Sequence, residues 1–294
     1  MGLCRASCKR HPGHAHHGGA LTLPEDSHEF KPILERMDDM IIDFGKTAAD
    51  YGRHRAGFPR EFFERLFRFG VVAAGDRVLD LGTGTGTIAR GLARGGCAVV
   101  GLDPSPDLLN EARRLSATKG ASIDYALGRA EETGQPDRAF DAVIAAQCWH
   151  WFNAAHAAAE ARRTLKPLGR LVMASFDWLP LPGSVVEATE QLILAHNPQW
   201  RFHGGNGVHV EWFADLAAGG FLGAECFGFD YAAPYTHEGW LGRIRASAGV
   251  GASLSPKEIE RFDKAHALLL AERFPEQPLE TPHRVFCTYG RAPD

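Results

Sequence analysis

The stretch VLDLGTGTGTIA (78–89) constrains the fold of this chain more than any other segment. An apolar run leads to Asp80 and then to Gly82, Gly84 and Gly86, where a helical pattern begins. Glycine adopts positive φ angles without strain and lets a ligand approach the backbone closely. A helix N-terminus presents free N–H groups and a partial positive charge, which suit a carboxylate or a phosphate. The stretch therefore predicts a buried strand, a ligand-binding turn and a helix.

Strand and helix signals alternate from this stretch onward. Apolar, strand-like runs lie at 77–82, 98–103, 123–128, 140–146 and 169–176. Helical patterns lie at 86–94, 106–118 and 154–165. Near-continuous apolar runs are expected for strands that are covered on both faces. The alternation predicts an α/β fold with a doubly wound, mostly parallel sheet.

The composition of the chain changes on both sides of this core. The expected segments are 1–27 (a polar, His-rich, disordered tail), 28–70 (helical), 71–177 (the core), 178–281 (helical, with a late strand) and 282–294 (the final strand and C-terminus). Within them we expect helices at 59–70, 184–196 and 256–274, a strand-like stretch inside 211–233, and a last strand at 283–290. Low apolar content and missing periodicity are the basis for predicting a disordered tail.

Length and charge exclude several classes of protein. The 294 residues, 45% of them hydrophobic, can bury one substantial core. A net charge of -4 gives no reason to expect a nucleic-acid or membrane partner, and no apolar run approaches the ~20 residues of a membrane span. The start of the chain lacks the apolar region of a secretory signal. Six irregularly spaced cysteines predict no disulfide framework, so we expect a reducing, cytoplasmic setting.

The tail contains side chains that could bind a metal. These are Cys4, Cys8, His11, His14, His16 and His17. Their spacing matches no zinc-finger pattern, and no second half of such a site follows. We therefore expect no metal site.

The second strand ends in an acid whose position suits a nucleoside. Asp103 lies 103 − 82 = 21 residues after Gly82, near the ~20 at which a carboxylate meets a ribose diol. This spacing suits NAD as well as other nucleoside cofactors. The offset through Gly84, Gly86 and Ala89 also fits the dinucleotide pattern G-x-G-x-x-G/A. On these residues alone, an NAD-dependent oxidoreductase remains an alternative.

The fuller pattern around the loop resembles a known family. Acid-x-Gly-x-Gly-x-Gly, starting at Asp80, resembles motif I of class I S-adenosylmethionine-dependent methyltransferases. The stretch 128–152 looks like the third and fourth strand region of that superfamily. The resemblance implies a seven-stranded, mostly parallel sheet with a helical lid built from 28–70 and 178–281. It implies the following cofactor contacts: Asp80, Gly82, Thr83, Gly84, Gly86, Asp103, Pro104, Ala130, Glu131 and Gln147. Arg129 stands where the family usually has an acid.

Three further segments are similar to the trans-aconitate methyltransferase-like enzymes, a small-molecule subgroup. They are YGRHRAGFP (51–59), AAQCWHWF (145–152) and the pair WLGRIRASAGVGASLSP and PHRVF (240–256, 282–286). Enzymes of the superfamily that methylate bases carry (Asp/Asn)-Pro-Pro-(Tyr/Phe) after the fourth strand. Gln147 to His150 do not match that pattern, and the chain has no basic stripe, so a nucleic-acid substrate is not expected.

The acceptor region is predicted beyond the fourth strand, because ligands bind at the carboxyl ends of parallel strands. His150 is the titratable candidate there, as a base or as a substrate contact, with packing between aromatics as the alternative. The further candidates for acceptor contacts are Tyr51, Arg53, Arg55, Trp149, Trp151, Arg243 and Arg245. Arginines suit carboxylates, although a solvated helix face and core packing are the alternative interpretations. The predicted function is methylation of a small molecule, and the specific form that the arginines suggest is methylation of an organic acid at its carboxyl oxygen. The alternatives are an NAD-dependent oxidoreductase and a non-catalytic cofactor-binding protein.

Overall fold

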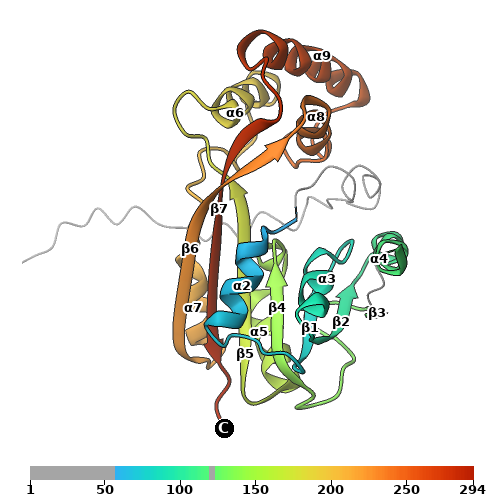
Figure 1. Cartoon of the computed structure of the whole chain (residues 1–294), viewed down its shortest axis with the longest axis vertical. Helices are drawn as coiled ribbons and strands as arrows, with labels where there is room; N and C mark the ends of the chain where they lie inside the picture. The colour runs from blue at the N-terminus through green and yellow to red at the C-terminus, as the bar shows by residue number, and fades with distance from the viewer. Residues whose placement is uncertain (1–56, 119–122) are drawn as a thin grey trace, which may run out of the picture. The chain divides into compact units, whose positions relative to one another are not determined.

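The structure, a computed structural model, describes residues 57–118 and 123–294 (Figure 1). The predictions for the tail and for Tyr51, Arg53 and Arg55 lie outside these residues. The helices are α2 (Arg60–Arg68), α3 (Thr87–Arg94), α4 (Pro106–Thr118), η3 (Trp149–Trp151), α5 (Ala154–Thr164), α6 (Val185–His196), α7 (Glu211–Ala218), α8 (His237–Arg245) and α9 (Pro256–Arg273). The strands are β1 (Arg77–Leu81), β2 (Ala98–Asp103), β3 (Asp124–Leu127), β4 (Phe140–Ala146), β5 (Leu165–Trp178), β6 (Leu222–Tyr235) and β7 (Leu279–Arg291).

The seven strands form one sheet in the order β3-β2-β1-β4-β5-β7-β6. Strands β1 to β5 pair in parallel, whereas β7 is antiparallel to both β5 and β6. The expected α/β fold with a mostly parallel, seven-stranded sheet is confirmed. The strand order reverses between β1 and β4, and such a reversal opens a ligand-binding crevice at the carboxyl ends of the strands.

Helices cover both faces of the sheet, as Figure 1 shows. On one face, Phe62 and Leu66 of α2 and Ile88 of α3 are buried in the same cluster as Val78 and Ala142 of the sheet. A second cluster joins the other face to α5 and α7 through residues that include Leu79, Val143, Ala157, Ala161 and Leu216. Alternate residues of a strand point to opposite faces, so each core strand needs apolar residues throughout.

The region after β5 differs from the prediction in two ways. Helix α7 precedes β6 in a segment for which we expected no helix, whereas β6 contains the expected strand-like stretch. Strands β5 and β7 extend beyond their predicted ends. The pairing of β6 with β7 continues to Tyr235 opposite Leu279, past the end of β5. This extended pair leads to the group formed by α6, α8 and α9 (Figure 1). In the described part of the chain no helix is both long and apolar enough to cross a membrane.

Candidate functional site

The glycine loop after β1 needs all three of its glycines, for different reasons. Gly82, Gly84 and Gly86 have φ angles of 60°, 54° and 78°, which residues with a Cβ atom rarely adopt. A Cβ at Gly82 would lie 2.9 Å from the Cys148 sulfur, and one at Gly86 would lie 2.2 Å from the Tyr125 hydroxyl. A Cβ at Gly84 would meet nothing closer than 4.0 Å. The backbone of Gly84 is therefore the part of the loop that a ligand can approach.

Asp80 fixes the strand end beneath this loop. Its carboxylate is buried and accepts a hydrogen bond of 2.6 Å from the Thr83 hydroxyl. Burial raises the pKa of Asp80 to about 7, and the hydrogen bond from Thr83 offsets only part of that effect. The nearby charge of Asp103 acts in the same direction as burial. Asp80 therefore orders the loop from within.

Asp103 links the end of β2 to the loop. One carboxylate oxygen accepts the Gly84 N–H at 2.9 Å, and the other accepts the Ser105 N–H at 2.9 Å. Burial raises the pKa of Asp103, and these two N–H donors counteract the shift. Each oxygen keeps a second lone pair that can accept a hydroxyl. Pro104, the next residue, is exposed.

The loop after β3 is tied to the start of α5. Ala130 is buried, and Glu131 accepts the Asn153 N–H at 3.0 Å. Asn153 is the N-cap of α5, and its own side chain accepts the His156 N–H. Arg129 lies 3.7 Å from the Glu131 carboxylate. Glu131, the residue expected to contact adenine, thus also positions α5, the helix that follows the turn after β4.

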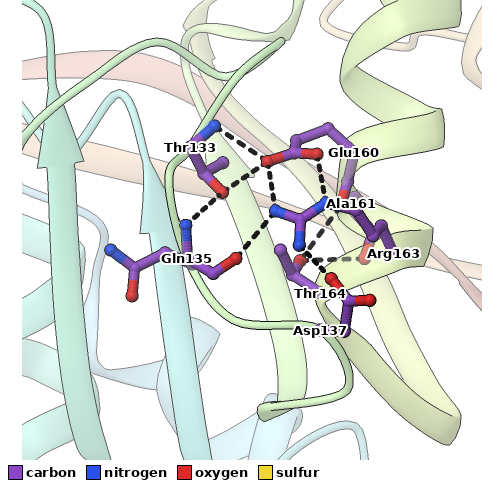
Figure 2. A network of polar contacts seen from close by, with 7 residues as sticks. All are labelled: Thr133, Gln135, Asp137, Glu160, Ala161, Arg163 and Thr164. Atoms are coloured by element: carbon purple, nitrogen blue, oxygen red, sulfur yellow. Dashed lines mark hydrogen bonds and ion pairs between the residues drawn. The ribbon is translucent and has the colours of Figure 1, made fainter.

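A polar network holds the rest of this loop against α5 (Figure 2). Glu160 accepts two hydrogen bonds from Thr133, from its N–H at 2.8 Å and from its hydroxyl at 2.6 Å. Arg163 donates to Glu160, to the Gln135 carbonyl at 2.8 Å and to Asp137. The hydrogen bond from Arg163 is the main cause that lowers the pKa of Glu160 to about 2. The loop between β3 and β4 is therefore fixed by one helix.

The turn after β4 is fixed by the two neighbouring strands. Gln147 has a positive φ of 64°, which is uncommon for a residue other than glycine. Its N–H donates to the Ala174 carbonyl at 2.8 Å, and its side-chain amide donates to the Phe176 carbonyl. The Cys148 thiol donates to the Leu81 carbonyl at 3.2 Å. The turn is thereby joined to β5 on one side and β1 on the other.

The aromatic residues of this turn have separate places. Trp149 is 2% exposed, and its indole N–H donates to Asp215 of α7 at 2.8 Å. This burial favours the packing alternative for Trp149, because its ring is buried and its indole N–H is already paired. His150 is exposed, and its ring lies 4.6 Å from that of Trp151, which is partly buried. His150 is thus the residue of η3 that is accessible.

Two residues that sequence reasoning missed meet at the end of β5. Asp177 accepts a hydrogen bond of 2.7 Å from His209, whose other ring nitrogen lies 3.2 Å from Glu211. The His209 ring stacks on Trp212 at 4.3 Å. Burial is the largest single effect and would lower the pKa of His209, but the hydrogen bonds and charges of Asp177 and Glu211 together outweigh burial and raise it. For Asp177, burial is the largest effect and raises the pKa, but the hydrogen bond and charge of His209, with smaller contributions from Ser175 and His150, together lower it.

Arg243 and Arg245 do not act as a pair. Arg245 forms an ion pair of 2.5 Å with Asp263 of α9, so its guanidinium is engaged in structure. The Arg243 guanidinium lies 4.8 Å from the centre of the Trp178 ring. Arg243 makes no ion pair with any residue of 57–118 or 123–294. Burial lowers its pKa, and the electrostatic effects of Tyr235 and Asp177 offset only part of the shift.

Comparison with known proteins indicates which kind of domain contains the glycine loop and Asp103. Residues 79–173 match the family model described as a methyltransferase domain. This part of the chain is similar to a methyltransferase domain. An uncharacterized methyltransferase from Mycobacterium tuberculosis is 41% identical over 133 residues, which are 45% of this chain and 51% of that protein. The chain thus spans about half the length of the curated relatives it matches.

Solved structures agree with the methyltransferase domain. One, described as a type II methyltransferase from Anaeromyxobacter dehalogenans, is 25% identical, with a TM-score of 0.57 over 81% of this chain and 98% of its own. Another is a phosphoethanolamine N-methyltransferase of Haemonchus contortus in complex with S-adenosyl-L-methionine. It is 20% identical, with a TM-score of 0.50 over 92% of this chain and 62% of its own, and it shows a shared fold.

The residues of the methyltransferase domain fit S-adenosylmethionine. The open side of Gly84 and the N-terminus of α3 suit the carboxylate of its methionine part, and the lone pairs of Asp103 suit its ribose hydroxyls. The match to a methyltransferase domain favours S-adenosylmethionine over NAD, a choice that Asp103 alone could not make. The trans-aconitate-like subgroup stays a prediction.

Proposed function

We propose that the chain is an S-adenosylmethionine-dependent methyltransferase that acts on a small organic acid. The observation that carries this proposal is the glycine loop joined to Asp103 at the reversal of strand order, inside the matched domain. Ligands of open α/β sheets bind at such a reversal. The cofactor assignment uses the loop residues Gly82 to Gly86 and Asp103, with Thr83 ordering the loop from Asp80.

The chemistry that the cofactor supplies is an electrophilic methyl group on a sulfonium, with a neutral leaving group. The protein then has to orient the nucleophile and exclude water. The turn from Gln147 to Phe152 is proposed to do this at the end of β4, and its hydrogen bonds to β1 and β5 support that role. Ala130 and Glu131 are proposed to border the adenine, and Pro104 the ribose.

Arg243 is the proposed anchor for a carboxylate of the acceptor. Its guanidinium lies against Trp178 and lacks an anionic partner in the described part of the chain. A buried cation is costly unless it is paired, and arginine binds carboxylates in bidentate geometry. An ionised carboxylate needs no base to accept a methyl group, whereas a protonated nucleophile does. His150, which is exposed beside Trp151, is the proposed base or substrate contact in the second case.

The proposal is tested by turnover with a panel of small carboxylic acids, phenols and amines. We expect release of S-adenosylhomocysteine with carboxylic acids, and a loss of at least tenfold in kcat/KM in Arg243→Gln, the scale of a charge-assisted hydrogen bond. Arg245→Gln is the matched control, because Arg245 is engaged with Asp263 on the same helix. Cofactor binding without turnover of any acceptor would instead support a non-catalytic binding protein.

A further inference from the structure

A positive charge is buried beside the glycine loop. Arg90 of α3 is 6% exposed, which makes it the least exposed arginine or lysine in the described part of the chain. It forms no ion pair with any residue of 57–118 or 123–294. A buried charge is costly unless an opposite charge lies near it. A ligand with an anionic group at the loop would offset this cost.

The Arg90 side chain reaches the backbone of the loop itself. Its Nη1 atom donates a hydrogen bond to the Thr85 carbonyl. A Cβ at Gly86 would lie 2.9 Å from the same nitrogen, so the guanidinium packs where other residues carry a side chain. Gly86 is the N-cap of α3, and the N–H groups of the first helical turn suit an anion. Arg90 therefore adds a full positive charge at the end of a helix that already attracts anions.

Tyr125 of β3 limits where this guanidinium can lie. Its hydroxyl is 2.9 Å from the Ser116 hydroxyl of α4, and a Cβ at Gly86 would lie 2.2 Å from it. Its ring lies against Gly101 of β2, where a Cβ would be 2.8 Å from two ring atoms. Tyr125 and the Arg90 guanidinium thus share the space beside Gly86, and both support the loop from that side.

Two buried acids at the same loop oppose an anionic ligand. They are Asp80, which accepts the Thr83 hydroxyl, and Asp103, which accepts the Gly84 N–H. Like charges repel more strongly where the protein excludes water. Burial raises the pKa of Asp80 to about 7, and the charge of Arg90 acts in the opposite direction. Arg90 is therefore the buried group that balances the charge of these acids.

We propose that Arg90 is a positioning residue that gives the loop its preference for the carboxylate of S-adenosylmethionine. The guanidinium acts through the Thr85 carbonyl and through its charge, and Tyr125 keeps it in place. The inference rests on the proposed function, because it concerns the same cofactor, and it assigns the recognition of one group of that cofactor. Without Arg90, the buried charges described around the loop would be Asp80 and Asp103 alone.

The test compares two ligands that differ only in the carboxylate. They are S-adenosylhomocysteine and its decarboxylated analogue, S-adenosyl-3-thiopropylamine. Calorimetric titration of the natural chain should give an affinity at least about tenfold higher for S-adenosylhomocysteine. In Arg90→Gln this preference should fall by about fivefold or more, because the charge is lost. Arg90→Lys keeps the charge and should retain most of the preference, although both affinities should fall because a lysine lacks the planar guanidinium.

Two further variants control for position and folding. Arg94 is exposed in the last turn of the same helix, so Arg94→Gln should leave the preference within about twofold. Tyr125→Phe keeps the ring and removes the hydroxyl that meets Ser116, so the preference should fall by about twofold to threefold. Urea denaturation without ligand reports the folding of each variant. If Arg90→Gln does not fold, Tyr125→Phe and Arg90→Lys decide the question.

The outcomes separate this inference from the proposed function. An equal loss of affinity for both ligands in Arg90→Gln would overturn the inference and leave Arg90 as a structural support of the loop. Loss of the preference in Arg90→Lys, an unchanged preference in Tyr125→Phe, or equal binding of both ligands by a natural chain that binds S-adenosylmethionine would also overturn it. A natural chain that binds neither S-adenosylmethionine nor S-adenosylhomocysteine would overturn the proposed function itself.

Discussion

The proposed cofactor side and the proposed acceptor side of the site share one edge of the sheet but are held by different contacts. On the cofactor side, the carboxylate of Asp103 and the carbonyl of Leu102 accept backbone N–H groups of the glycine loop. Those contacts connect residues about 20 positions apart in the sequence, and in each of them the donor is a backbone N–H group. On the acceptor side, His209 reaches Asp177, and Arg243 of α8 lies over Trp178. Those contacts join side chains from separate elements.

The difference indicates what each side can tolerate. The cofactor side depends on backbone geometry, so the smallest added side chain should disrupt it. The acceptor side depends on ionisation and burial, so pH and charge should change it while the loop stays intact. Each prediction below separates one side from the other, in order of expected effect.

The largest effect is expected from a methyl group in the glycine loop. Gly86→Ala places a Cβ 2.2 Å from the Tyr125 hydroxyl at a φ of 78°. Left-handed backbone and overpacking together should cost about 3 kcal/mol or more of the free energy of unfolding. Urea denaturation measures this loss.

Gly84→Ala is the matched variant, because its φ is 54° but the nearest atom to its Cβ is the Gly82 carbonyl oxygen at 4.0 Å. Its free energy of unfolding should fall by only about 1–2 kcal/mol, from the backbone alone. Its affinity for S-adenosylmethionine should fall at least about tenfold, since the new methyl group occupies the open side of the loop. Equal destabilisation of both variants would contradict the distinction between the two glycines.

The second effect is a pH dependence in the group of α6, α8 and α9. The buried His266 ring contacts the Thr189 hydroxyl, which also accepts the Trp240 indole N–H. Burial lowers the pKa of His266 to about 4, below its ordinary 6.5. The unfolded chain therefore binds this proton first as the pH falls. The titration of His266 therefore leaves the free energy of unfolding unchanged above pH ~6.5. Between that pH and about pH 4 it lowers the free energy of unfolding by about 3 kcal/mol.

This pH dependence is measured by urea denaturation at several pH values for the natural chain and for His266→Gln. The glutamine variant lacks the titrating ring, so its stability should fall less between pH 6.5 and 4.5. Parallel curves for the two proteins would show that His266 does not cause the decline. S-adenosylmethionine affinity at pH 6.5 should be the same in both, because the cofactor side contains neither His266 nor its partners.

The third and smallest effect separates packing from function within the turn after β4. Trp149→Phe removes the hydrogen bond to Asp215 and should cost about 1–2 kcal/mol of stability, while kcat/KM changes less than about twofold. His150→Ala removes an exposed side chain, so its stability should stay within about 0.5 kcal/mol, while turnover of an acceptor with a protonated nucleophile falls. Steady-state kinetics and urea denaturation on both variants measure the difference. A large loss of kcat/KM with little loss of stability in Trp149→Phe would instead support contact between Trp149 and the acceptor.

The cofactor side could be predicted from the sequence because its determinants are local. Three glycines, a buried acid and an acid at the end of the next strand follow one another within about 25 residues. Their positive φ angles and the link from Asp103 to Gly84 agree with that prediction. The strands of the core were predictable for the same reason, since each is a short, apolar run.

The acceptor side could not be predicted in the same way. Asp177 and His209 lie 32 residues apart, and their meeting depends on how the loop before α7 packs against β5. Trp149 looked like a pocket residue because α7, which covers it, was not recognised as a helix. Residues two apart on a helix face different directions, so the identification of α8 separates Arg243 from Arg245.

The most direct test of the account is calorimetric titration of the folded protein with S-adenosylmethionine, comparing Asp103→Ala with Asp107→Ala. Asp107 is an exposed acid in the first turn of α4, so its loss should leave affinity unchanged. Loss of the Asp103 carboxylate should weaken binding by about 1–3 kcal/mol, the scale of hydrogen bonds to a charged group. Equal affinities for both variants, or no binding by the natural chain, would contradict the assignment of this edge of the sheet to the cofactor.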